Sequence, residues 1–371
     1  MDLNSRLDQV LVTASETARE VDAKAQFPFD AVNALRRSGL LGLTLPKEVG
    51  GLGGGPAELV TTLTRLASVC GSTAMVYLMH VAAAMTVAAT PPRQPKDLLP
   101  SMASGERLGT LAFSEAGSRS HFWAPISKAV RRGERIQLEA SKSWVTSAGL
   151  AEVYVVSTGS ADGDGIDLFA VTSDMEGSTV TGDWHGMGMR GNASNPMRFD
   201  LEVSDDYRIG DAGTGFDLMV STVMPWFNLG NAAVSVGLGD GAVTAAVRHA
   251  SAAQLVHLEQ SLSALPTIRA RLAQMSIQLA ATRAYVDQAA VRIAQPADDT
   301  PLHVLGVKAA ANDAVLGITD SAMRVCGGAA FSEHLQVDRY FRDARAGHVM
   351  APTADVLYDL YGKAITGQAL F

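Results

Sequence analysis

The chain has 371 residues, of which 47% are hydrophobic and 18% charged, and its formal net charge is -8. This composition excludes a disordered chain and suggests two or three domains. No Lys/Arg-rich run occurs, so a nucleic-acid partner or an anionic membrane surface is not expected. Only 6% of the residues are aromatic whereas 35 are Gly. We therefore expect Ala and Gly to fill much of the core and helices to approach one another closely.

The cysteines and the N-terminal residues indicate the cellular compartment of the protein. Cys70 and Cys326 are the only cysteines and lie far apart in the sequence, which excludes a disulfide framework and a multi-cysteine metal site. We expect two buried free thiols, no metal site and a cytoplasmic protein, because the first twenty residues lack the layout of a signal peptide. The apolar run at residues 72–90 is of membrane length but rich in Ala, which favours a buried helix over membrane insertion.

The sequence pattern changes twice along the chain and divides it into three regions. Residues 1–107 show apolar residues at helical spacing, which predicts an N-terminal helical domain. Residues 108–209 contain short runs such as EVYVVST and IDLFAVT separated by turn residues, which predicts a β domain. Residues 210–371 return to long helical patterns, enough for a helical bundle. The run GLGGG at residues 51–55 follows no predicted strand, so it is not a dinucleotide-binding loop.

Five motifs in this order resemble those of the acyl-CoA dehydrogenase superfamily. They read LRRSGLLGLTLPKEVGGLGGG, LAFSEAGS, KSWVTSAGLAEVYVV, GMGMRGNASNPMRFD and CGGAAFSEHLQVDRYFRDARAGHVMAPT. The resemblance covers nearly the whole chain. It implies an α+β multidomain fold with an N-terminal helical domain, a middle β-barrel-like domain and a C-terminal four-helix bundle. It also implies a bound FAD between barrel and bundle and a homodimer or homotetramer.

The motif KSWVTSA carries the flavin prediction. Trp144 and Thr146 alternate with Val145, so a strand points both toward one face. The resemblance implies that the tryptophan packs on the isoalloxazine and that the hydroxyl donates to flavin N5. The resemblance extends the cofactor-binding set to further positions in the other motifs: Ser114, Gly117, Ser118, Gly327, Gly328, Thr353 and Asp355.

The carboxylate that acyl-CoA dehydrogenation needs is absent from this sequence. The reaction removes a weakly acidic Cα proton, so a base within hydrogen-bond reach is required. The resemblance places a Glu nine residues after Arg342, where this chain has Ala351. Some members carry the base on the first bundle helix instead, and that position is Phe227.

Three histidines remain as candidate catalytic residues: His348, His121 and His80. His348 lies just before Ala351, His121 follows the shortened Ser114–Ser118 loop, and His80 lies on the apolar helix where the resemblance implies a substrate pocket. The predicted pocket residues are His80, Met224, Trp226 and Phe227.

Three functions stay open at this point. The first is α,β-dehydrogenation of an acyl thioester, on CoA or a carrier protein, with a non-standard base and an electron-transfer protein as partner. The second is a two-component monooxygenase that hydroxylates carbon, nitrogen or sulfur with reduced FMN or FAD from a flavin reductase. The third is a catalytically silent subunit that binds flavin or an active partner.

Overall fold

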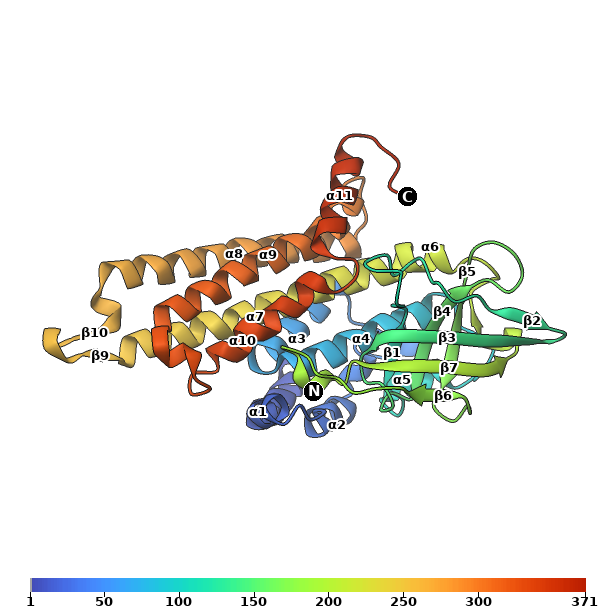
Figure 1. Cartoon of the computed structure of the whole chain (residues 1–371), viewed down its shortest axis with the longest axis horizontal. Coiled ribbons are helices and arrows are strands. Elements are labelled where there is room, and N and C mark those ends of the chain that lie inside the picture. The colour runs from blue at the N-terminus through green and yellow to red at the C-terminus, as the bar shows by residue number, and fades with distance from the viewer. Residues whose placement is uncertain (1) are drawn as a thin grey trace.

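The computed structural model describes residues 2–371 and arranges them as helices, then two sheets, then helices (Figure 1). The predicted α+β organisation is therefore confirmed. The first region contains α1 (Leu3–Ala23), α2 (Phe29–Ser38), α3 (Pro56–Val69), α4 (Gly71–Ala89) and α5 (Leu98–Ser104). Pro56 occupies the first turn of α3, where its missing N–H costs nothing, and Glu58 accepts from the Gly55 N–H at 2.8 Å.

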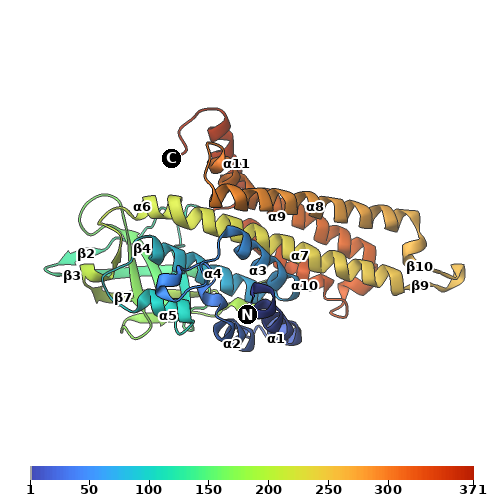
Figure 2. The same cartoon turned by 180° about the vertical axis from the view of Figure 1, so that it is seen from behind.

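Helix α4 is the predicted buried helix. Among residues 2–371 it is the one helix long and apolar enough to cross a membrane, and 78% of that apolar window is buried inside the protein. Its neighbours are α3 and the first long helix of the bundle (Figure 2). The prediction of a core helix is confirmed.

Two four-stranded sheets make up the middle region. One has the order β1 (Gly109–Ala112), β4 (Val153–Gly159), β5 (Ile166–Thr172) and β8 (Arg208–Ile209). The other has the order β2 (Val130–Arg132), β3 (Arg135–Val145), β7 (Asn195–Val203) and β6 (Ser178–Val180). Strands β4 and β5 are buried along almost their whole length, whereas β7 alternates buried and exposed residues. The two sheets share a core of their own that includes Tyr154, Phe169 and Phe199.

The last region is a helical bundle. The short α6 (Gly215–Leu218) and a π-helical turn (Met219–Val223) lead into α7 (Met224–Ala252), and α8 (Pro266–Ala294), α9 (Thr300–Cys326), α10 (Val337–Val349) and α11 (Ala354–Ile365) follow. A small hairpin, β9 (Gln254–Leu255) with β10 (Gln260–Ser261), joins α7 to α8 at the far end of the bundle (Figure 1). Helix α11 packs on α9 and projects out of the bundle, at an angle to its long helices (Figure 1).

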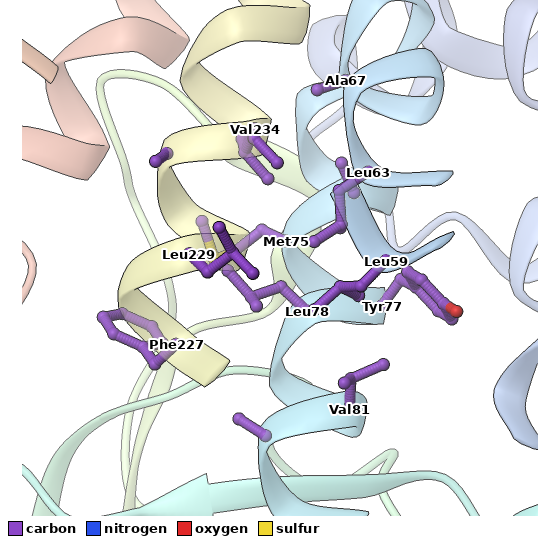
Figure 3. Packing of buried hydrophobic residues seen from close by; sticks show 14 of the residues in the cluster. Leu59, Leu63, Ala67, Met75, Tyr77, Leu78, Val81, Phe227, Leu229 and Val234 are labelled. Carbon is purple, nitrogen blue, oxygen red and sulfur yellow. The ribbon is translucent and has the colours of Figure 1, made fainter. Parts of the chain in front are cut away.

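Glycines on α7 let the N-terminal helices pack closely against the bundle. A Cβ on Gly230 would lie 2.2 Å from Leu78 of α4, and one on Gly237 would lie 2.2 Å from the Thr64 carbonyl oxygen of α3. Figure 3 shows the resulting core, in which Leu78 of α4 lies between α3 and Leu229 of α7. The expectation of close helix packing is confirmed.

Candidate active site

The end of β3 departs from simple alternation. Up to Lys142 the even-numbered residues are buried, and the register with β7 then shifts between Lys142 and Val145. Beyond this irregularity Val145 is buried, whereas Trp144 is 63% exposed. The ring of Trp144 packs edge-on against that of Trp184, with 5.8 Å between the ring centroids. Thr146 lies just past the strand and is buried. The shift re-aims these side chains, as β-bulges do beside functional sites.

The Thr146 hydroxyl meets a second hydroxyl. Its Oγ1 lies 3.1 Å from Ser194 Oγ, and both side chains are buried. Backbone bonds hold the two segments together, because Ser147 N donates to the Asn192 carbonyl at 2.9 Å. Ser194 was not among the predicted site residues, although it lies within the quoted motif GMGMRGNASNPMRFD.

A buried ion pair anchors the loop that carries three predicted cofactor residues. Lys142 Nζ donates to Glu115 Oε1 at 2.6 Å and to the Ser157 carbonyl at 2.6 Å. Glu115 Oε2 also accepts from the backbone N–H groups of Ile126 and Ser127. Burial lowers the pKa of Lys142 to about 8. Against the opposing effect of burial, the Lys142 charge and these hydrogen bonds hold the pKa of Glu115 below its usual range.

The predicted cofactor residues of that loop differ in whether their groups are free to contact a ligand. Gly117 has φ +98°, a conformation that favours glycine, and a Cβ added there would meet nothing closer than Ile126 at 3.8 Å. The Ser118 hydroxyl is buried and donates to the Glu115 carbonyl at 2.9 Å, so its proton points into its own loop. Ser114 lies two residues past the end of β1, where its carbonyl accepts from Ser143 N at 2.8 Å and joins the loop to β3.

A buried lysine holds the turn between α10 and α11, which contains Ala351. Lys308 of α9 is 0% exposed, and its Nζ donates to the carbonyls of Gly347, Met350 and Pro352 at 2.8, 3.1 and 2.8 Å. Among residues 2–371 no carboxylate pairs with it, and burial lowers its pKa to about 7. Sequence reasoning missed this residue, although a lysine between Val307 and Ala309 in an apolar helix face is a signal for burial.

Helix α10 is tied to both other regions. Arg342 makes a bidentate pair with Asp22 of α1, at 2.8 and 2.5 Å. Asp343 accepts from the backbone N–H of Met189, in the segment before β7, at 2.6 Å. Full burial raises the pKa of Asp343 to about 6. These contacts fix the turn after α10 relative to the sheets.

Two further pairs of predicted cofactor residues lie at helix ends. Gly327 and Gly328 follow α9, and a Cβ on either would meet nothing within 4 Å, so their backbone faces open space. Thr353 is the N-cap of α11 without a side-chain capping bond, and Asp355 lies exposed in the first turn of that helix. No partner holds the Asp355 carboxylate among residues 2–371.

His80 has a structural role in this geometry. Its side chain is 0% exposed, its Nδ1 accepts from Gly109 N at 2.9 Å, and its Nε2 lies 3.0 Å from the Leu41 carbonyl. Burial lowers its pKa to about 4, which keeps the ring neutral. Both ring nitrogens are used in joining α4 to β1 and to the loop after α2, so neither is left for a substrate. We correct the prediction of a catalytic or pocket-lining His80 accordingly.

His348 and His121 are placed differently. His348 Nδ1 lies 3.3 Å from Asp313 of α9, a carboxylate that also accepts from Tyr358 of α11 at 2.5 Å. His121 is exposed, its ring packs edge-on against Trp123 at 5.3 Å, and it lines a cavity of about 690 Å³. The structure therefore does not bring the three candidate histidines together.

That cavity lies between the loop after β1, α6, α11 and the segment that follows α11. Its walls mix aromatic and charged side chains: His121, Trp123, Phe216, Asp355, Val356, Asp359, Leu360, Lys363, Leu370 and Phe371. Its volume is in the range of small-molecule sites. The predicted pocket residues Met224, Trp226 and Phe227 do not line it. Phe227 is buried in the core that α7 shares with α4 (Figure 3). Met224 is buried in the same core, and Trp226 packs against it.

The region around Trp144 fits the isoalloxazine of a flavin. Trp144 offers an exposed apolar ring, and Thr146 beside it has hydrogen-bonding capacity beyond its one bond to Ser194. Ser147 Oγ and both amide atoms of Asn192 are buried without a partner among residues 2–371. Buried polar atoms are normally paired, so this neighbourhood has unfilled polar capacity. No group of three or more His, Cys, Asp or Glu within residues 2–371 is arranged to hold a metal ion.

Family profiles match nearly the whole chain. The acyl-CoA dehydrogenase N-terminal, middle and C-terminal domains match residues 10–106, 110–201 and 213–366. The chain belongs to the acyl-CoA dehydrogenase family, a family of flavin-dependent oxidoreductases. A relative in Mycobacterium tuberculosis, the probable acyl-CoA dehydrogenase FadE25, is 26% identical over 356 residues, which are 94% of this chain and 90% of the relative.

Solved structures share the fold. Butyryl-CoA dehydrogenase from Megasphaera elsdenii superposes with a TM-score of 0.91 at 22% identity, covering 99% of this chain and 100% of that one. The prolyl acyl carrier protein oxidase AnaB superposes with a TM-score of 0.88 at 19% identity, covering 98% of each chain. The acyl-CoA dehydrogenase fold predicted from the motifs is confirmed.

Proposed function

We propose that this chain is an FAD-dependent enzyme that oxidises the Cα–Cβ bond of an acyl thioester carried on CoA or on a carrier protein. The observation that carries the proposal is the exposed Trp144 beside the buried Thr146, at the face of β3 where the resemblance places the flavin. Relatives named as acyl-CoA dehydrogenases and a fold neighbour named as a prolyl acyl carrier protein oxidase support the two carriers.

FAD bound here would supply the hydride acceptor for the reaction. Trp144 would pack on its ring, and Thr146 would present a hydroxyl to N5, the atom that accepts the hydride. Gly117 has φ +98° and no side chain, so it would let the backbone approach the diphosphate of FAD closely. Gly327, Gly328, Thr353 and Asp355 remain the proposed contacts to the adenosine half.

The cavity of about 690 Å³ is the proposed place of the thioester arm. It combines apolar walls with a few polar groups, as sites for small molecules do. His121 is the proposed base, because its imidazole is exposed, has no side-chain hydrogen bond among residues 2–371 and lines this cavity. Ala351 and Phe227 offer no group that accepts a proton.

The first test is spectroscopic. The purified protein should be yellow and release near-stoichiometric FAD, and anaerobic acyl-CoA or acyl carrier protein thioesters should bleach the flavin absorbance. His121→Ala should slow the bleaching about 100-fold, within the usual contribution of a general base. Phe331→Ala, at a phenylalanine that is 89% exposed and lines no part of this cavity, is the matched control. A flavin that every thioester leaves oxidised would contradict the dehydrogenase assignment.

A two-component monooxygenase is the second candidate, favoured by one observation. Both positions at which the resemblance places a base are apolar here, Ala351 and Phe227, and an oxygenase needs no Cα base. Such an enzyme would ignore thioesters and would consume NAD(P)H and O2 once a flavin reductase is added. Oxygen uptake in the presence of a reductase therefore separates the two functions.

Replacing Ala351 with glutamate should raise the rate of thioester bleaching at least 10-fold. The turn that carries Ala351 is held by three hydrogen bonds from Lys308, so a new carboxylate would be presented from a fixed backbone. General-base catalysis contributes a factor of about 10²–10⁴. Stopped-flow absorbance measures the rate. Ala351→Gln is the control, because glutamine has the shape of glutamate but no charge. Equal rates in the two variants would show that position 351 does not face the thioester.

The partners follow from the same proposal. A dehydrogenase needs an electron-transfer protein to reoxidise its flavin, whereas the oxygenase needs a reductase. A homodimer or homotetramer, as the resemblance implies, and a cytoplasmic location, as expected from the cysteines and the N-terminal residues, complete the proposal.

A further inference from the structure

The Thr146 hydroxyl can donate its proton either to Ser194 or away from it. It has one bond among residues 2–371, to Ser194 Oγ at 3.1 Å, and either oxygen can be the donor. A hydroxyl has one proton and two acceptor lone pairs. If Thr146 donates its proton toward a flavin, it cannot also donate to Ser194. The bond between the two then requires that Ser194 be the donor.

The backbone holds the two hydroxyls face to face. Val145 pairs with Asn195 across β3 and β7, and just beyond this pair Ala148 N donates to the Ala193 carbonyl at 3.1 Å. Ser147 and Ala193 both have positive φ, +59° and +48°, which non-glycine residues adopt at a cost. Such conformations persist where the surrounding structure fixes them, and they cluster at functional sites. Thr146 and Ser194 are thus held in place by strained neighbours on both segments.

Burial makes the direction of this bond consequential. Thr146 is 4% and Ser194 5% exposed, so water has little access to compete for either hydroxyl. Removing the Ser194 hydroxyl would take away the one group in the described part of the chain that hydrogen-bonds to the Thr146 hydroxyl, and with it the constraint on the direction of the Thr146 proton.

We infer that Ser194 is a positioning residue for the flavin, which donates its hydrogen bond to Thr146 and so directs the Thr146 proton toward the cofactor. The inference rests on the proposed function, in which the flavin lies against Trp144 and Thr146. Ser194 acts through Thr146 and need not touch the flavin. A hydroxyl pair that merely fastens β3 to β7 would affect stability alone, and this difference makes the inference testable.

The experiment compares Ser194→Ala, Thr146→Val and the double variant with wild type. Ser141→Ala, at an exposed position of the same strand, is the matched control. Each protein is characterised by the melting temperature of the flavin-free form, by the dissociation constant of oxidised FAD from fluorescence titration, and by the midpoint potential and visible spectrum of bound FAD. Ser194→Thr, which keeps a hydroxyl, tests for rescue.

Ser194→Ala should bind reduced FAD within about 3-fold of wild type but bind oxidised FAD about 10-fold less tightly, because N5 accepts a hydrogen bond when the flavin is oxidised and carries a hydrogen of its own when it is reduced. The loss of one directed hydrogen bond is of this size. The midpoint potential should rise accordingly, and the melting temperature should stay near that of Ser141→Ala. Thr146→Val should show the same shift, and the double variant no more than either alone, because the two hydroxyls act as one unit. Ser194→Thr should restore the wild-type potential.

Two results would overturn the inference: the first leaves the proposed flavin site standing, and the second does not. If Thr146→Val raises the potential while Ser194→Ala matches Ser141→Ala in every readout, Ser194 does not position Thr146 and the proposed flavin site stands. If Thr146→Val also leaves the potential unchanged, or if the wild-type protein binds no FAD, the proposed flavin site falls and the role of Ser194 falls with it. A Ser194→Thr variant that behaves like Ser194→Ala would also exclude the hydroxyl as the cause.

Discussion

Replacing Lys142 with methionine is expected to lower the free energy of unfolding by about 3–5 kcal/mol, the usual result of removing one partner from a buried ion pair. Lys142 is 1% exposed, and its loss would leave the Glu115 carboxylate buried without a counter-charge. Chemical denaturation followed by circular dichroism measures the effect. Because Glu115 also holds Ile126 and Ser127, the loop between β1 and β2 should loosen as well.

Two variants make this result interpretable. Lys24→Met removes a lysine from an exposed pair with Glu20, whose side chains are 65% and 55% exposed, and should change stability by less than about 1 kcal/mol. The double variant Lys142→Met/Glu115→Gln should regain part of the loss, since no buried charge remains and the glutamine can still accept from Ser127. A Lys142→Met protein as stable as Lys24→Met would show that burial of the pair contributes little.

The sequence predicted the fold because its signals are local or ordered along the chain. Periodicity separated the helical ends from the β segment, and the five motifs placed each region in one family. The apolar composition of residues 72–90 marked α4 as a core helix, because Ala-rich runs with Ser, Thr and His pack against protein more readily than against lipid. The high glycine content gave a general signal for close helix packing, and the structure shows which glycines of α7 allow it.

The candidate site was predicted less completely, because its defining contacts join residues far apart in the chain. Ser194 meets Thr146 from 48 positions away, and Lys308 reaches carbonyls about 40 positions further along. Neither pairing has a signal in spacing. Likewise, His80 resembled a catalytic residue until its two ring nitrogens were found on the backbone of Leu41 and Gly109.

The irregular end of β3 shows a second limit. Alternation predicts one face for Trp144 and Thr146, but it does not predict the register shift after Lys142, nor that Trp144 is exposed and Thr146 buried. A bulge depends on the partner strand, here β7, and cannot be read from the bulged strand by itself.

Lys308→Met is the second variant with a large expected effect, and its cost should depend on pH. The folded pKa of Lys308 is about 7, against an ordinary value of 10.5, because burial disfavours the ammonium. Between these two values the unfolded chain binds more protons than the folded one, so the contribution of Lys308 to stability rises with pH. From pH 7 to pH 9 the difference in unfolding free energy between wild type and Lys308→Met should therefore grow by about 2 kcal/mol.

The comparison isolates Lys308, because every other titrating group, Lys142 and Asp343 included, is common to both proteins and cancels in the difference. The variant also leaves the carbonyls of Gly347, Met350 and Pro352 without their donor, which adds a cost of about 1–3 kcal/mol for each that stays unpaired. The stability difference between wild type and Lys24→Met should stay flat over the same range. A flat difference for Lys308→Met would mean that Lys308 keeps an ordinary pKa in the folded protein, and hence that the turn carrying Ala351 is open to water.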